Sequence, residues 1–187
     1  MNSLSLLASL KGLLLLCSAC SALRQWDYEP LSVTPYTSDE SKLFMEAKTE
    51  RMGRDGYAVS VKLGIHYDFD DTTMVEAMGY RSSSGSEDDY TPLPWKINSQ
   101  NYRTFFDDYY ADMLYKNLNH CSDLPHPDNI DPFPNGDYEL DKCVVNGDGF
   151  PEILPEGYFK VVFNVSGEVD WGFVIIVRVF KKTDLIG

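Results

Sequence analysis

The sequence has 187 residues, of which 29 are acidic and 16 are basic, so the formal net charge is −13 at pH 7. An acidic surface of this kind repels nucleic acids and anionic lipid surfaces and argues against either as a partner. It favours solubility and partners that are basic or neutral. The length suits one domain with a sizeable core better than two domains.

The first residues have the pattern of a secretory signal peptide. The run from Leu13 to Leu16 is apolar but too short to cross a bilayer, and Cys20 to Ala22 are small residues at a cleavage position. We therefore predict that residues 1–22 are removed and that residues 23–187 form a single secreted, extracellular domain. The alternative, an uncleaved membrane anchor, needs a longer apolar span.

Alternating apolar residues predict strands in the first part of the domain. An opening strand near residues 26–33 contains Pro30 and is followed by Pro35, and the two prolines confine it to a sheet edge. A second strand begins at Leu43, where apolar residues alternate with charged ones as far as Glu50.

The longest alternation runs from Tyr57 to Phe69 and predicts one strand of about 40 Å at about 3.3 Å per residue. This is long for a globular protein, so Gly64 is expected to bend it. Residues 73–80 are predicted to be its partner strand. Residues 81–90 are rich in serine, glycine and acids, which predicts an exposed and mobile loop.

Between residues 101 and 118 the apolar spacing changes to that of an amphipathic helix, with Asn98 and Ser99 before it as candidate caps. The apolar face is rich in aromatic side chains. It comprises Phe105, Phe106, Tyr109, Tyr110, Met113 and Leu114.

Cleavage of the signal leaves two cysteines, Cys121 and Cys143. An even pair in a secreted chain is most simply one disulfide, which would tie the end of the helix to a strand through Tyr138 and Leu140. The prolines of residues 125–134 rule out regular structure in between. Two free thiols or a metal site are the alternatives.

The most regular pattern lies in residues 154–181 and predicts a β-hairpin. Apolar residues alternate with other residues on each arm of the turn Ser166 to Glu168. Before the turn they are Phe159, Val161, Phe163 and Val165, and after it they are Trp171, Phe173, Ile175, Val177 and Val179. Asn164 begins an Asn-Val-Ser glycosylation sequon on the face opposite the phenylalanines. We therefore predict a glycoprotein with its sugar at Asn164. The order of strands, helix and strands predicts a mainly β fold, an antiparallel β-sandwich or β-cup with one amphipathic helix packed on it.

Common catalytic motifs are missing from the sequence. It has no G-x-S-x-G, P-loop, G-x-G-x-x-G or H-E-x-x-H pattern, and His66, His120 and His126 share no metal-ligand spacing. The aspartates of residues 68–71 and the segment 146–149 do not fit an EF-hand loop. Acidic clusters are most simply solvated surface. We therefore predict no enzyme activity, no catalytic residues, no metal and no cofactor.

An apolar helix over an apolar sheet can either pack a solid core or enclose a cavity for an apolar ligand. For the cavity hypothesis, the helical and strand periodicities select the ligand contacts, and Val161 is left unassigned. The predicted ligand-binding residues are Phe105, Phe106, Tyr109, Tyr110, Met113, Val61, Leu63, Ile65, Phe163, Trp171 and Phe173.

The mature sequence resembles the insect chemosensory proteins called CheB. The likeness rests on the start at Trp26, the tyrosine-rich helix ending near Cys121, the proline loop, and above all the stretch from Gly147 to Phe173. That family is similar to the ML lipid-recognition and ganglioside-activator proteins, in which a β-cup holds a lipid between two sheets. The resemblance implies a secreted protein of taste or smell sensilla that takes part in the pheromone response.

Two functions from different classes follow. The first is a binding protein that holds a hydrophobic small molecule, a pheromone or lipid, in an apolar β-cup and presents it to a receptor or, by transient contact, to a membrane. The second is an extracellular accessory protein that modulates a sensory-neuron receptor or ion channel, with the acidic loop from Ser84 to Tyr90 meeting a basic partner. An extracellular hydrolase is the weakest alternative.

Overall fold

The computed structural model describes residues 25–53, 56–145, 147 and 150–182. The predicted signal peptide, residues 1–22, lies outside the described residues. Within them, two antiparallel sheets form a sandwich, accompanied by one helix of 17 residues. The predicted fold class is confirmed.

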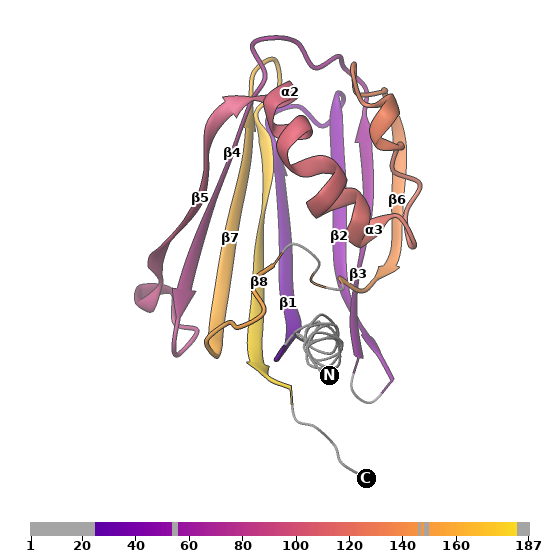
Figure 1. The fold of residues 1–187 in the computed structure, drawn as a ribbon. Helices are drawn as coiled ribbons and strands as arrows, with labels where there is room; N and C mark the ends of the chain where they lie inside the picture. Colours follow the sequence, from indigo (N-terminus) through magenta and orange to yellow (C-terminus); the bar gives the residue numbers. More distant parts are fainter. Residues whose placement is uncertain (1–24, 54–55, 146, 148–149, 183–187) are drawn as a thin grey trace, which may run out of the picture.

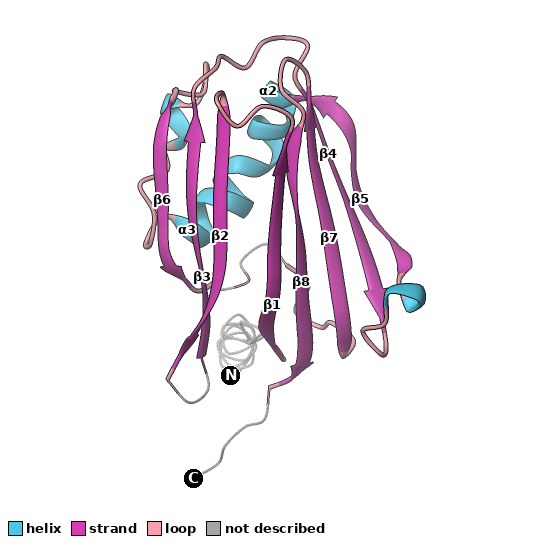
Figure 2. Cartoon of the chain, turned by 180° about the vertical axis from the view of Figure 1, so that it is seen from behind, coloured by secondary structure: helices cyan, strands magenta, loops and turns pink. Residues whose placement is uncertain are grey.

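Among the described residues, the larger sheet has five strands in the order β1-β8-β7-β4-β5, and the smaller sheet has three in the order β2-β3-β6. Figure 1 shows the sheets on either side of the helix, which crosses the front of the molecule. Seen from behind, the edge strands β1 and β2 are neighbours (Figure 2). The strands are β1 Trp26–Thr37, β2 Leu43–Met52, β3 Gly56–Ile65, β4 Met74–Ser82, β5 Thr91–Asn101, β6 Gly136–Cys143, β7 Gly157–Ser166 and β8 Trp171–Lys181.

The helix forms where the sequence predicts it. It runs without interruption through α2 Tyr102–Phe105, a π-helical segment η3 Phe106–Tyr115 and α3 Lys116–Leu118. The predicted caps, Asn98 and Ser99, are wrong, because both lie within strand β5. The cap is Asn101, whose side-chain oxygen accepts a hydrogen bond of 3.0 Å from the backbone N–H of Arg103. Two short 3-10 turns, η2 Glu87–Asp89 and η4 Pro127–Asn129, lie in the connecting loops.

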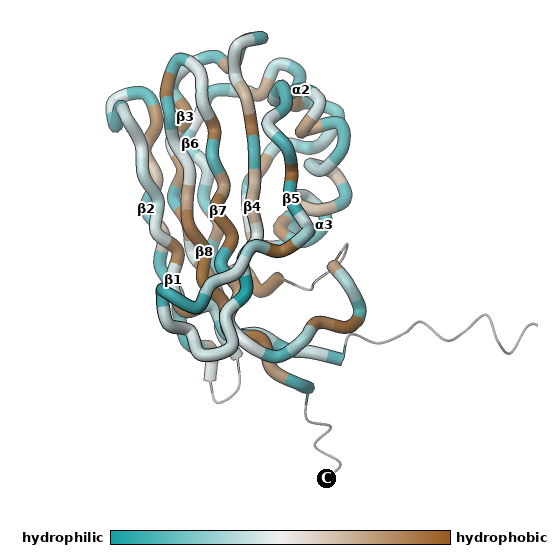
Figure 3. Tube along the Cα trace, turned by 90° about the vertical axis from the view of Figure 1, so that its left-hand side faces the viewer, coloured by the Kyte–Doolittle hydropathy of each residue, from teal (hydrophilic) through white to brown (hydrophobic). Residues whose placement is uncertain are grey.

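The hairpin predicted from residues 154–181 is also confirmed. Strands β7 and β8 pair antiparallel, with Phe163 opposite Phe173 and Val165 opposite Trp171. Figure 3 shows that hydrophobic residues are concentrated along these two strands. The opening strand β1 lies at a sheet edge, as its prolines indicate.

The predicted strand from Tyr57 to Phe69 is wrong in length, because β3 ends at Ile65. Apolar alternation continues past the strand since Tyr67 and Phe69 turn into the core, where their ring centroids lie 5.2 Å apart. The expected bend at Gly64 is wrong as well. Gly64 pairs regularly with both neighbouring strands, and the register shift against β6 lies between Val59 and Val61.

Two strand pairings differ from prediction. Residues 73–80 do not pair with β3, because β4 crosses to the larger sheet and lies between β7 and β5. Strand β5 was not predicted, since Pro92 and Pro94 break its alternation. Both prolines are tolerated because β5 is an edge strand, where one row of N–H groups needs no partner.

Buried side chains form two separate clusters. The lower core lies at the end where β1 begins and contains Trp26, Phe159 and Val179, with Tyr28, Leu93, Leu154 and Val177 packed against it. The upper core lies at the end where the helix begins and contains Leu43, Ile65, Tyr67, Phe69, Val75, Ala77, Ile97, Tyr102, Phe105, Tyr110, Ile130, Phe133, Val165, Val169 and Trp171.

Candidate ligand-binding site

Strand register arranges the inward-facing side chains of each sheet in rows, because directly paired residues project to the same face. In the larger sheet, the row Pro35, Phe173, Phe163, Ala77 is followed toward the lower core by the row Val33, Ile175, Val161, Gly79. In the smaller sheet, the corresponding rows are Met45, Leu63, Tyr138 and Ala47, Val61, Leu140.

Some of the predicted ligand-binding residues are fully buried in the upper core. These are Ile65, Phe105, Tyr110 and Trp171. The Tyr110 hydroxyl donates a hydrogen bond of 2.7 Å to the Pro125 carbonyl, and the Trp171 ring N–H donates one of 2.9 Å to the Tyr67 hydroxyl. Burial raises the pKa of Tyr67 to about 12. Side chains held in this way serve as packed core at the upper end.

The remaining predicted ligand residues are half-buried. Leu63, Phe106, Tyr109 and Phe163 pack against the upper core. Phe163 stacks on Phe173 with ring centroids 4.9 Å apart and meets Phe105 edge-on at 5.6 Å. Met113 and Val61 lie outside both clusters. The aromatic rings at Phe163 and Phe173 therefore mark the lower boundary of the upper core.

Between the two cores, apolar side chains of both sheets are only partly buried. We call this region the midsection and define it by Val33, Val161 and Ile175 of the larger sheet and Ala47 and Val61 of the smaller sheet. All five are half-buried and belong to neither core. In a closely packed sandwich, inward-facing residues of central strands are buried between the sheets.

Two neighbouring isoleucines of β8 lie on opposite faces of the sheet. Ile175 points inward and Ile176 points outward, yet both are half-buried. Ile175 sits beside Val161 and Val33, whereas Ile176 sits beside Lys160 and Ser32. Ile175 is thus still partly exposed, although it lies on the inner face of the sheet. An apolar guest could complete that burial.

Two shallow hollows on the described surface lie elsewhere, at β6 and its neighbours. One is lined by Cys121, Ser122, Asp123, Glu139 and Asp141, and the other by Phe44, Lys62, Leu63, Gly64, Asp123, Asp137, Tyr138 and Glu139. Carboxylates line both hollows, although the second also includes Leu63, one of the predicted ligand-binding residues. Neither hollow lies between the two sheets at the height of Val161 and Ile175. We therefore place the candidate site in the midsection.

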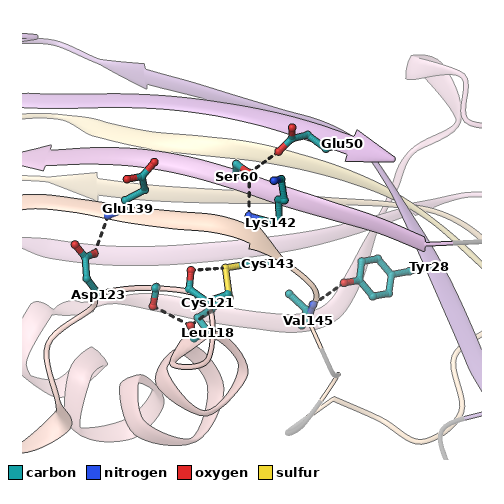
Figure 4. Close-up of a disulfide and its surroundings, with 11 residues drawn as sticks. Tyr28, Glu50, Ser60, Leu118, Cys121, Asp123, Glu139, Lys142, Cys143 and Val145 are labelled. Carbon is teal, nitrogen blue, oxygen red and sulfur yellow. Dashed lines mark hydrogen bonds between the residues drawn. A yellow bond between two sulfur atoms is a disulfide. The ribbon is translucent and has the colours of Figure 1, made fainter. Parts of the chain in front are cut away.

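The disulfide Cys121–Cys143 is present, as predicted, and ties the end of the helix to the last residue of β6 (Figure 4). Hydrogen bonds fix both flanks. Asp123 accepts one of 2.7 Å from the backbone N–H of Glu139, and the Tyr28 hydroxyl accepts one of 2.8 Å from the backbone N–H of Val145. The lower end of the helix is therefore anchored to β6, and the segment that follows β6 is bound to β1.

The predicted glycosylation site, Asn164, lies on the outer face of β7. Its side-chain amide donates a hydrogen bond of 2.9 Å to Glu76 on β4 and its oxygen accepts one from the Tyr36 hydroxyl of β1. Tyr36 crosses β8 directly over Gly172, where an added Cβ would overlap the Tyr36 hydroxyl and the Phe163 carbonyl. Gly172 is thus required for this contact. Glycosylation at Asn164 stays a prediction.

The loop of residues 81–90, expected to be mobile, is organised around one carboxylate. Asp89 accepts hydrogen bonds from the hydroxyls of Ser82, Ser83 and Ser84 and from two of their backbone N–H groups. These donors hold the pKa of Asp89 well below its ordinary value. Glu87 in the same loop pairs with Lys160 of β7 at 3.0 Å. Part of the acidic loop is therefore neutralised within the chain.

Two of the histidines are paired with aspartates at the surface. His66 meets Asp137 at 2.9 Å and His126 meets Asp128 at 3.2 Å, each with about half of its side chain exposed. In the part of the chain that the structure describes, no three or more His, Cys, Asp or Glu side chains converge as metal ligands. None of the described helices has the length and hydropathy needed to span a membrane.

Several midsection residues were missed by sequence reasoning. The alternating patterns contain four of them, Val33, Ala47, Val161 and Ile175, but alternation does not distinguish them from other inward-facing residues. Whether an inward-facing residue belongs to a core or to the midsection depends on its position along the strand direction. That position depends on how the strands pair, which alternation within one strand does not determine.

Residues 75–161 match a family described as a protein of unknown function, DUF1091, a family associated with ML-like lipid-recognition proteins. The matched range begins in β4, includes the helix and β6, and ends at Val161 in β7. No curated protein matches the chain.

Proposed function

We propose that the protein binds a hydrophobic small molecule, a pheromone or lipid, in the midsection between its two sheets, as a secreted chemosensory binding protein of the CheB type. The observation that carries the proposal is the set of half-buried apolar side chains on facing inner surfaces, Val33, Val161 and Ile175 opposite Ala47 and Val61. The family match to proteins associated with lipid recognition supports it.

Burial of an apolar chain supplies the affinity. Each buried methylene contributes about 0.8 kcal/mol, so a chain of about ten carbons reaches about micromolar affinity after the cost of association. The contacts that we assign are the midsection residues together with Met113, Phe163 and Phe173 at its upper boundary. Four other predicted ligand-binding residues are buried in the upper core next to this boundary and do not contact the ligand, namely Ile65, Phe105, Tyr110 and Trp171.

Release to a receptor or membrane would take place at the lower end. There, the backbone of residues 150–153 is bound to the start of β1, since the Trp26 ring N–H donates a hydrogen bond of 2.8 Å to the Pro151 carbonyl. The same segment exposes two large apolar side chains, Phe150 at 41% and Ile153 at 69%. Such side chains suit transient contact with an apolar partner surface.

Two matched variants of the full chain, produced by secretion, test the proposal. Ile175→Asn places an amide in the midsection, whereas Ile176→Asn makes the same change on the outer face of the same strand. An unpaired amide facing a bound apolar chain costs about 1–3 kcal/mol. We expect Ile175→Asn to weaken binding of a fluorescent fatty-acid probe about tenfold or more and Ile176→Asn to leave it unchanged.

Mass spectrometry of organic extracts from the purified protein provides a second readout. A co-purifying lipid that is lost in Ile175→Asn supports the proposal. If the wild-type protein carries no lipid and does not bind the probe, the carrier function is refuted. The accessory role at a receptor or channel would then be the better explanation.

A further inference from the structure

Arg81 is a cation on the inner, apolar face of the larger sheet. It pairs with Phe159 of β7, which in turn pairs with Val177 of β8, so the three side chains leave the sheet on the same side. This row lies two residues below the row of Gly79 and Val161. The backbone of Arg81 therefore lies about 7 Å along the strand from the midsection. Its guanidinium lies beside Glu156 and Gly157, at the start of β7.

The charge of Arg81 has no carboxylate partner among the described residues, although the chain has 29 acidic side chains. Five described cations, Lys42, Lys48, Arg103, Lys160 and Lys181, form ion pairs with an aspartate or glutamate. Within the described part of the chain, Lys62, Lys96 and Arg178 form none, like Arg81, so burial of its Nε is what distinguishes Arg81. The Arg81 guanidinium donates one hydrogen bond of 2.6 Å to the Glu156 carbonyl. Its Nε is buried and has no hydrogen-bond partner.

A buried donor without an acceptor is costly and rare in folded proteins. Guanidinium has five donors in a planar fork that matches a carboxylate. The unused Nε–H thus points to a missing acceptor, and the most favourable acceptor for a cation is an anion.

The path from Arg81 into the midsection is apolar. Gly79, the next inward-facing residue of β4, has no side chain and is covered by Trp95 and Leu93 of β5, which lie 3.2 and 3.3 Å from where its Cβ would stand. Val161 and Ile175 lie in the same row of the sheet as Gly79. A molecule with a charged end at Arg81 could therefore extend its chain over Trp95 and Leu93 toward Val161 and Ile175 without burying another polar group.

We propose that the ligand is amphipathic, with an anionic head group such as a carboxylate bound by Arg81 and an apolar chain in the midsection. The inference rests on the proposed function and specifies its ligand class. The net charge of −13 opposes the approach of an anion. At physiological salt this repulsion is screened over about 8 Å, whereas the contact with a partly buried guanidinium persists.

The test measures displacement of a neutral fluorescent probe from the full chain by decanoic acid, 1-decanol and methyl decanoate at pH 8, where the acid is ionised. In the wild-type protein we expect decanoic acid to bind about tenfold or more tightly than the alcohol and the ester. Arg81→Gln should remove this preference and leave alcohol binding unchanged. Arg178→Gln changes the exposed arginine on the outer face of β8 and should keep the preference.

The outcomes are distinguishable. If all three molecules bind the wild-type protein equally, the midsection binds apolar chains but the role of Arg81 is refuted. If Arg81→Gln weakens acid and alcohol alike, the residue is structural and the inference fails. If none of the three binds, the proposed function itself fails. Should Arg81→Gln not fold, the comparison of acid with alcohol in the wild-type protein and in Arg81→Lys decides the question.

Discussion

Adjacent residues of the same type can have different structural roles in this protein. Asp89 is one of three consecutive acidic residues, but only its carboxylate gathers the hydroxyls of Ser82, Ser83 and Ser84. Ser82 is almost fully buried by the loop that results. A solvated acidic cluster is therefore the correct interpretation for Asp88 and is wrong for Asp89.

The low pKa of Asp89 predicts a pH dependence of stability. As the pH falls, the unfolded chain takes up a proton near pH 4 while the folded chain resists protonation, so the stabilisation by Asp89 is complete above about pH 5 and declines below about pH 4. Asp89→Asn should therefore lower the free energy of unfolding more at pH 7 than at pH 2.5. Urea denaturation at both pH values measures the difference.

Asp88→Asn is the matched control, since it removes the same charge from the same loop without removing these hydrogen bonds. It should lower the free energy of unfolding less than Asp89→Asn at pH 7. Equal effects of the two variants at both pH values would show that the serine hydrogen bonds contribute nothing.

At the scale of elements, local patterns were sufficient wherever partners are close in sequence. The hairpin of β7 and β8 follows from alternation and a turn, and the helix follows from the spacing of its apolar residues, although its cap is Asn101 and not the predicted Asn98 or Ser99. Strand partners that are remote in sequence were not predictable in this way. β4 follows β3 in the chain but pairs in the other sheet, because burial of both sheets depends on the whole topology.

The disulfide is the element-scale feature that the sequence predicts best, and its removal has a calculable effect. Cys121 and Cys143 are 22 residues apart, and closing a loop of this size in the unfolded chain is worth about 3 kcal/mol. We expect Cys121→Ser with Cys143→Ser to lower the free energy of unfolding by about this amount in urea. Because the bond anchors the helix end to β6, amide hydrogen exchange should rise first in residues 113–123.

The wild-type protein under reducing conditions serves as the comparison for that double variant. Both should show the same stability and the same exchange pattern. A double variant as stable as the oxidised wild-type protein would mean that the hydrogen bonds at Glu139 and Val145 hold this region without the disulfide.

At the scale of the molecule, the sequence predicted two sheets and a helix but not where the interior is solid. From the sequence, the aromatic face of the helix could either pack a solid core or line a cavity. In the structure, Phe105 and Tyr110 belong to a core around Phe69 and Phe133. A residue belongs to the core or to the midsection according to its distance from this cluster along the sheets. That distance depends on the register between strands that are far apart in the sequence.

The difference between a solid and an open interior can be measured by adding volume at Val161. In a closely packed core, Val161→Phe would strain its surroundings and lower the free energy of unfolding by about 1–3 kcal/mol. In the midsection, Val161 is half-buried beside Gly79, so we expect a change within about 0.5 kcal/mol. The added ring should at the same time reduce the affinity for the fluorescent fatty-acid probe several-fold, because it occupies space assigned to the ligand.

Val165→Phe is the matched control. It makes the same change two rows higher in β7, in the upper core, and should be strongly destabilising. Equal destabilisation by both variants would mean that the interior is packed along its whole length, and the site would have to be sought elsewhere.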